Sequence, residues 1–303
     1  MIESVFLPFK KRIFAYYLTS IMKRAIIFII SIIMPLIAGA QAQIDTKKVK
    51  ISDFTQKVTK VVLNGNEFMD ITFQDEITAR WRISPFEFCT LEEFEKIKSD
   101  ENYYFLMITY GQFRKETAPG MQFLTLVKGG KGAEKGIGDM LEVVSIPFAS
   151  AEYPSGRELV FLPAFLDIIQ NHTLAAMESD YSGYNGLASN NGNIGRSDGM
   201  QIVFSEDDLA FDVTPEFRES LAENDIIVAE EDDADGYLID NAPGTLVSYV
   251  AAPTEPVAGS FCYMMLIDTQ SHKLYYYKKH RIGKKAGAGF MQDDVERIKS
   301  HRR

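Results

Sequence analysis

Apolar and polar positions in the first half of the chain follow the spacing of strands and helices in turn. Spacings of three and four residues predict a helix at 68–81, with Phe68, Ile71, Ile77 and Trp81 on one face, and another at 163–177 that begins with a proline. Thr90-Leu-Glu-Glu93 has the order of a capping box and predicts the start of a third helix. Short apolar runs predict strands at 57–63, 83–89, 103–110, 122–128 and 141–147.

The second half shows a similar alternation. Leu209, Val213, Phe217 and Leu221 form an apolar stripe that predicts a helix restarting at Pro215. The last two of its apolar runs, separated by Asp268-Thr-Gln-Ser-His272, predict a β-hairpin. Apolar runs predict strands at 201–204, 226–228, 245–251, 261–267 and 273–279.

Both halves repeat the order strand, helix, strand, acidic segment, strand, strand. Val61 lies 141 residues before Ile202, Phe86 lies 141 before Ile227, and Leu126 lies 140 before Leu266. We interpret this as an α+β fold of two duplicated β-α-β-α-β-β units with mixed sheets, packed around a pseudo-twofold axis with a cleft between them. Identity between the halves is negligible, so the alternative is that any α+β chain of this size alternates in a similar way.

Composition divides the chain further. Residues 181–200 are rich in Gly, Asn and Ser, which is typical of a linker. The expected domains are therefore a first unit at 43–180, a linker at 181–200, a second unit at 201–280 and a basic C-terminal extension at 281–303.

The N-terminal segment 1–42 has the order of a secretory signal peptide. Lys23 and Arg24 follow Met22, thirteen almost wholly apolar residues occupy 25–37, and small residues follow up to Ala42. We interpret Met22 as the true start and place cleavage after Ala40 or Ala42. The alternative is a membrane anchor, but a spanning helix needs about 20 apolar residues. The expected location is periplasmic or secreted, and the processed chain is not expected to be an integral membrane protein.

Charge and cysteine content narrow the class of protein. The net charge is −10, and removal of residues 1–42 takes away five cations and one anion, which leaves −14. An acidic chain argues against nucleic-acid binding, which requires neutralisation of phosphates. Cys89 and Cys262 each lie in an apolar run, so we expect buried thiols rather than a disulfide or a zinc site.

Two charged segments are candidate sites. The acidic run could gather carboxylates for Ca²⁺, although the spacing of a calcium loop is missing and a solvated helix start explains the charges equally. Its members are Glu230, Glu231, Asp232, Asp233 and Asp235. The basic C-terminal segment could bind an envelope protein partner or an anionic surface, or it is a solvated end. Its candidate binding residues are Lys278, Lys279, Arg281, Lys284 and Lys285.

No catalytic motif stands out, and no cofactor is expected. The Gly-rich segment 129–138 lacks the Gly-Lys-Ser/Thr of a phosphate-binding loop. We therefore expect an exported, non-catalytic protein-binding or envelope-associated protein. The alternative is a periplasmic hydrolase or glycan-binding protein that uses carboxylates from distant segments.

Overall fold

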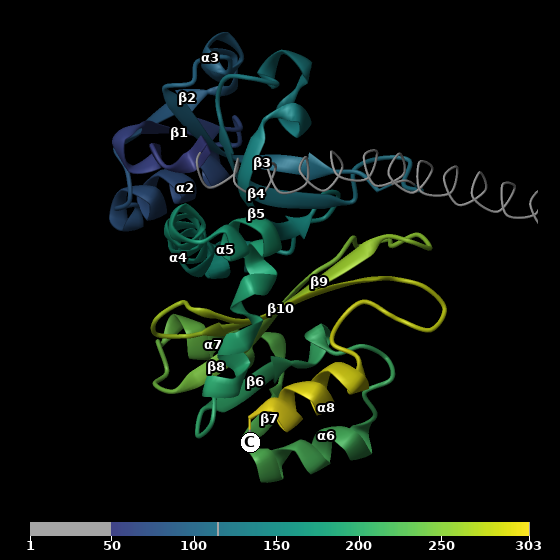
Figure 1. Ribbon diagram of the computed structural model, residues 1–303. Coiled ribbons are helices and arrows are strands. Elements are labelled where there is room, and N and C mark those ends of the chain that lie inside the picture. The colour runs from purple at the N-terminus through teal and green to yellow at the C-terminus, as the bar shows by residue number, and fades with distance from the viewer. Residues whose placement is uncertain (1–49, 114, 303) are drawn as a thin grey trace, which may run out of the picture.

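The computed structural model describes residues 50–113 and 115–302. The predicted signal peptide lies outside these residues. Within them the chain forms an α+β fold with two mixed five-stranded sheets, one above the other in Figure 1. The predicted fold class is confirmed, and the two sheet units are similar.

The first unit extends from β1 to α4. Its sheet order is β2-β1-β3-β4-β5, in which β1 pairs in parallel with β2 and β3, and β3, β4 and β5 are antiparallel. Helices make the crossovers that parallel pairing requires. The elements are β1 (Val58–Leu63), α2 (Glu67–Arg80), β2 (Phe86–Thr90), α3 (Leu91–Ile97), β3 (Tyr103–Gly111), β4 (Met121–Lys128), β5 (Leu141–Ser150) and α4 (Arg157–Glu178).

The second unit, from β6 to α8, repeats this topology. Its sheet order β7-β6-β8-β9-β10 matches that of the first unit strand for strand, with the same parallel and antiparallel pairs. Each unit is thus β-α-β-α-β-β-β-α, one strand and one helix longer than the predicted repeat. The elements are β6 (Gln201–Ser205), α6 (Pro215–Leu221), β7 (Ile226–Ala229), α7 (Glu231–Ile239), β8 (Thr245–Ala251), β9 (Phe261–Asp268), β10 (Leu274–Arg281) and α8 (Gln292–His301).

Strand pairing allows the residues of the two units to be aligned. We align the pair Met107–Thr125 of the first unit with the pair Tyr249–Met265 of the second, which sets equivalents 142 residues apart in β3/β8 and 140 apart in β4/β9. With this alignment the pairs Thr59–Tyr104 and Ile202–Leu246 give 143 for β1/β6. The pairing fixes only the sum of the β3/β8 and β4/β9 spacings, so the predicted spacings of 141 for Val61 and 140 for Leu126 stay predictions.

Residues 181–200, predicted as a linker, join the units as a structured segment. They lie in α5 (Asp180–Asn185), in the 3₁₀ helix η4 (Gly186–Arg196) and in the turn that leads to β6. The Asn191 and Asn193 side-chain amides donate to the carbonyls of Tyr277 and Leu274 at 2.9 and 2.8 Å. The asparagines of this segment therefore satisfy main-chain groups along β10.

Residues 281–303, predicted as a basic extension, contribute the last helix of the second unit. Phe290 and Ile298 are buried in the same apolar cluster as Leu221 of α6. By position, α8 follows β10 as α4 follows β5. The segment is therefore part of the second unit's helix layer.

The two units stack head to tail, so the predicted pseudo-twofold arrangement is wrong. The face of sheet 1 that carries α2 and α4 packs on the face of sheet 2 that carries α7, and side chains of Ile77, Phe165 and Leu238 share one core. Phe94 of α3 and Leu221 of α6 lie in separate clusters on the outer sides. A twofold axis would bring the same face of each unit together. Figure 1 shows α3 and sheet 1 in the upper part, α4 in the middle, and sheet 2 with α7, α6 and α8 in the lower part.

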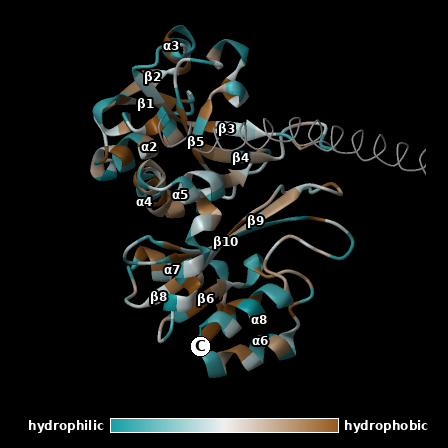
Figure 2. Cartoon of the chain, in the orientation of Figure 1, coloured by the Kyte–Doolittle hydropathy of each residue, from teal (hydrophilic) through white to brown (hydrophobic). Residues whose placement is uncertain are grey.

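Helix α4 is the apolar layer shared by the two sheets. Within the described residues it is the one helix long and apolar enough to cross a membrane, but 61% of that stretch is buried inside the protein. It begins at Arg157, so Pro163 lies inside the helix and not at its start as predicted. Figure 2 shows apolar strands on both sides of it and hydrophilic stretches on α6 and α8 at the far end.

The buried face of α2 also differs from the prediction. Phe73 and Ile77 are buried, whereas Phe68 is 71% exposed and Ile71 is 53% exposed. Burial is decided by α4, which α2 contacts across the core. The capping box of α3 is confirmed, because Thr90 accepts from the Glu93 amide at 3.2 Å and Glu93 accepts from the Thr90 amide at 2.8 Å.

Candidate functional site

The predicted acidic site of α7 is occupied by an arginine from the first unit. Arg157, the first residue of α4, donates from Nε to Asp235 at 2.9 Å and from Nη1 to Asp208 at 2.8 Å. Its Nη2 donates to the Ser248 carbonyl at 3.1 Å, and Glu231 lies 3.8 Å from Nε. Arg157, Asp208 and Asp235 are all buried. This network joins the two units at the carboxyl end of β6.

Burial and charge act in opposite directions in this network. Burial raises the pKa of Asp235 and of Glu231 above the usual carboxylate values, and Arg157 only partly offsets it. Burial lowers the pKa of Arg157, but the two aspartates outweigh it, so the guanidinium stays charged. Glu230 lies at the N-cap of α7, and Asp232 and Asp233 are exposed on its first turn. Among the described residues no group of three His, Cys, Asp or Glu side chains could hold a metal ion.

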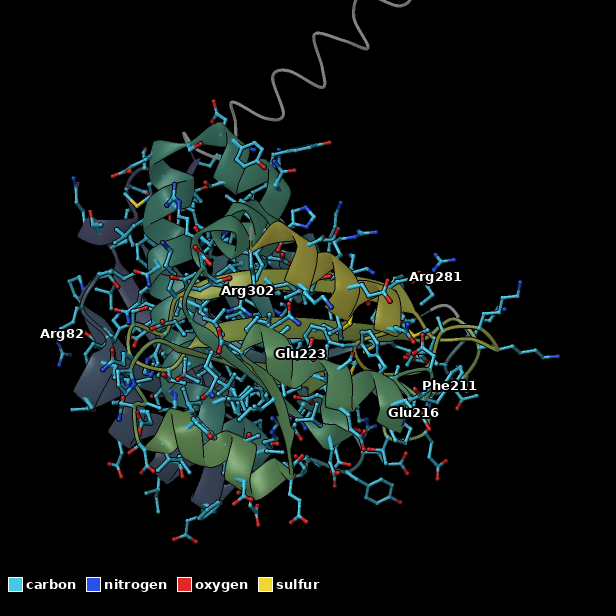
Figure 3. The ribbon with its side chains drawn as sticks, turned by 90° about the horizontal axis from the view of Figure 1, so that it is seen from below. Arg82, Phe211, Glu216, Glu223, Arg281 and Arg302 are labelled. Carbon is cyan, nitrogen blue, oxygen red and sulfur yellow. The ribbon has the colours of Figure 1, made fainter. Side chains whose placement is uncertain are left out.

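The basic residues at the C-terminal end serve different purposes in the structure. Lys278 pairs with Asp294, while Lys279 and Arg281 lie over the ring of Phe261 at 5.6 and 5.3 Å. Lys284 and Lys285 are exposed in the turn after β10. Arg281 lies at the outer edge of the molecule in Figure 3. Of the five cations, one is therefore paired with an acid, two share one aromatic ring and two lie in an exposed turn.

Sequence reasoning missed a groove on the α3 side of sheet 1. It has a volume of about 730 Å³ and lies beside α3 and the carboxyl ends of β1 and β3. Leu91 and Tyr110, 52% and 60% exposed, are among its apolar lining residues. The groove is lined by apolar and polar residues, which include Val62, Asn64, Asn66, Met69, Leu91, Met107, Thr109, Tyr110, Phe123, Thr125, Val127, Ile137, Met140, Glu142 and Ser145.

Hydroxyl groups run across the floor of the groove. The Thr109 and Thr125 hydroxyls are 2.8 Å apart, and those of Thr125 and Ser145 are 3.0 Å apart. These two bonds use two of three hydroxyl hydrogens, so one end of the row can still donate. Polar residues on an otherwise apolar sheet face, at Thr109, Thr125 and Ser145, were the signal in the sequence.

On the second unit, α4 together with strands β4 and β5 covers the face equivalent to this groove. Tyr249, the equivalent of Met107, lies with its ring centroid 4.6 Å from that of Phe161 and 5.0 Å from that of Phe165. Met265, the equivalent of Thr125, is fully buried in the same core. The repeat therefore presents one sheet face twice, covered by a helix on the second unit and open on the first.

The two cysteines are free and lie far apart in the fold. Cys89 belongs to the cluster beneath α3, and Cys262 to the cluster beneath α8. Burial raises the pKa of Cys89 to about 11 and that of Cys262 to about 12. Both thiols therefore stay protonated near neutral pH and act as small apolar side chains.

Comparison with known proteins gives no further assignment. No protein-family model, no curated protein and no solved structure matches the chain. The functional argument therefore depends on the geometry of this chain.

Proposed function

We propose that this chain is an exported, non-catalytic module that binds another protein through the groove on its first unit. The supporting observation is the unequal use of one sheet face. On the second unit this face binds a protein segment, α4, whereas on the first unit it is open. A surface that already binds a helix in one repeat is suited to bind a protein in the other.

The lining of the groove supports binding more than catalysis. Leu91 and Tyr110 offer apolar area that is more than half exposed, a feature of interaction sites. Glycoside hydrolysis needs two carboxyl groups across the scissile bond. Among the described residues that line the groove, Glu142 is the one acid. The alternative of a hydrolase with dispersed carboxylates has less support at this site.

The test is crosslinking and co-purification of the tagged chain from its native envelope. Leu91→Asp and Tyr110→Asp place charge on the groove rim, where both side chains are already exposed, so the fold is retained. We expect each variant to lose a stoichiometric protein partner. Ile239→Asp is the matched control, because Ile239 is 62% exposed on α7 outside the groove, and it should keep the partner.

A second variant examines the basic residues. Lys284→Gln with Lys285→Gln removes two exposed cations of the turn after β10. Loss of the partner in this variant, with retention in Leu91→Asp, would move the binding site to that turn. A chain that co-purifies with no protein would contradict the proposed function.

A further inference from the structure

The open groove of the first unit corresponds to the surface of sheet 2 on which α4 packs in the second unit. The pairs Phe105–Val127, Met107–Thr125 and Thr109–Phe123 stand at the positions of Val247–Ile267, Tyr249–Met265 and Ala251–Tyr263. In the second unit these residues face the shared core, where Tyr249 packs against Phe161 and Phe165 of α4 and Tyr263 packs against Phe123 of β4. In the first unit Met107, Thr109, Phe123, Thr125 and Val127 line the groove.

From this equivalence we infer that the groove receives an amphipathic α-helix of a partner protein, seated across sheet 1 as α4 is seated across sheet 2. This inference rests on the proposed function and specifies the partner's binding element. The exposed surface is a sheet face, where side chains project, and not a sheet edge, where main-chain groups would pair with a strand. Layered α/β proteins cover such faces with helices.

The groove and the surface on which α4 packs differ in charge, and this difference defines the partner helix. In the second unit Arg157, the first residue of α4, forms ion pairs with Asp208, Asp235 and Glu231. Thr90 and Glu230 are the N-caps of α3 and α7, so Leu91 stands where Glu231 stands. The loop after β1 contributes Asn64 and Asn66 to the groove. The partner helix therefore begins with a neutral residue and not with a cation.

Within the part of the chain that the structure describes, neither α4 nor α8 of a second copy supplies such a helix. Helix α8, which occupies the position of α4 in the second unit, exposes Asp293, Glu296 and Arg297. Helix α4 is itself covered by both sheets. The stack is therefore closed by a polar surface at the α8 end and open at the α3 end, which leaves the groove for a different protein.

The experiment places a photoreactive amino acid at Leu91 and, separately, at Tyr110 of the full chain in its native envelope. We expect the crosslinked residues of the partner to lie three, four or seven positions apart in one apolar segment. A synthetic peptide of that segment should gain helical circular dichroism when it binds. Leu91→Asp should weaken peptide binding at least tenfold, and Ile239→Asp less than twofold.

Other outcomes separate the inference from the proposed function. Crosslinks at alternate residues, with no gain of helix, would overturn the helix but leave a protein-binding groove. Crosslinks to lipid alone, or to a second copy of the chain, would overturn both.

A double variant tests whether the partner helix begins with a neutral residue. Asn66→Asp with Leu91→Glu places acids where the second unit has them, and Asp remains a good N-cap for α2. We expect a peptide with an arginine added at its N-terminal end to bind this double variant at least fivefold more tightly than it binds the unaltered protein. Equal binding to both would contradict the neutral start of the partner helix.

Discussion

At the scale of single residues, Arg157 carries the contact between the two units. It begins α4 in the first unit, and its guanidinium contacts Asp235, Asp208, Glu231 and the Ser248 carbonyl of the second. Asp208 in turn accepts from the Ser248 hydroxyl at 2.5 Å, which uses its other oxygen. A buried ionic group of this kind contributes little net stability as a pair, but the loss of one member leaves the other charges buried and uncompensated.

We therefore expect Arg157→Leu to lower the free energy of unfolding by about 3–5 kcal/mol. Adding Asp208→Asn and Asp235→Asn should recover part of this loss, because it removes the uncompensated charges. Urea unfolding of the three proteins measures both effects. Lys96→Ala breaks an exposed i,i+4 pair with Glu92 and should cost at most about 0.5 kcal/mol. A loss of similar size for Arg157→Leu would contradict the structural role of the network.

At the scale of elements, the sequence pattern predicted the features that depend on neighbouring residues alone. The strands at 103–111, 121–128, 245–251 and 261–268 and the β9–β10 hairpin follow from apolar runs and turn residues, and the Thr90–Glu93 cap follows from its spacing. The buried face of α2 and the start of α4 did not follow, because distant segments decide them: Phe73 is buried and Phe68 is not.

The groove could not be predicted from the sequence for a related reason. It exists because α4 packs on one copy of a repeated sheet face, whereas α3 covers only part of the other. That is a property of how the units stack. The sequence held only indirect signs of it, in the hydroxyl residues Thr109, Thr125 and Ser145 on an otherwise apolar sheet face.

The short helix η1 (Phe54–Gln56) supplies a prediction at this scale. Asp53, its N-cap, accepts from the Tyr104 hydroxyl at 2.7 Å and from Lys128 Nζ at 2.9 Å, which ties η1 to β3 and β4. Burial raises the pKa of Asp53, but the hydrogen bonds from Lys128 and Tyr104 outweigh it and hold the pKa below its usual 3.8. The carboxylate thus stabilises the fold above that value, and the contribution is lost as pH falls through the lower folded pKa.

Asp53→Asn should therefore destabilise the protein by about 0.5–1 kcal/mol at pH 7, a small effect because the pair is partly exposed. The difference between the two proteins should shrink toward zero as the pH falls below 3.8. Urea unfolding at pH 7, 5, 4 and 3 measures it. A difference that stays constant over this range would mean that the charge of Asp53 plays no part.

At the scale of the whole molecule, the head-to-tail stack makes the two units depend on each other. The largest apolar cluster includes side chains of both sheets and of α2, α4 and α7, and the Tyr249 hydroxyl donates across the interface to the Phe148 carbonyl. Neither unit can separate without exposing this core to water, which is unfavourable in proportion to the apolar area. The chain is therefore expected to unfold as one cooperative body despite its two sheets.

Calorimetry with two distant variants tests this coupling. Phe94 is fully buried under α3 at one end of the stack, and Phe290 is fully buried under α8 at the other. Phe94→Ala and Phe290→Ala should each cost about 3–5 kcal/mol, and each should lower the temperature of the same single transition. If the units were independent, two transitions would be seen, and each variant would move only the one belonging to its own unit. Because the clusters of Phe94 and Phe290 are separated by the shared core, a common shift can arise only through that core.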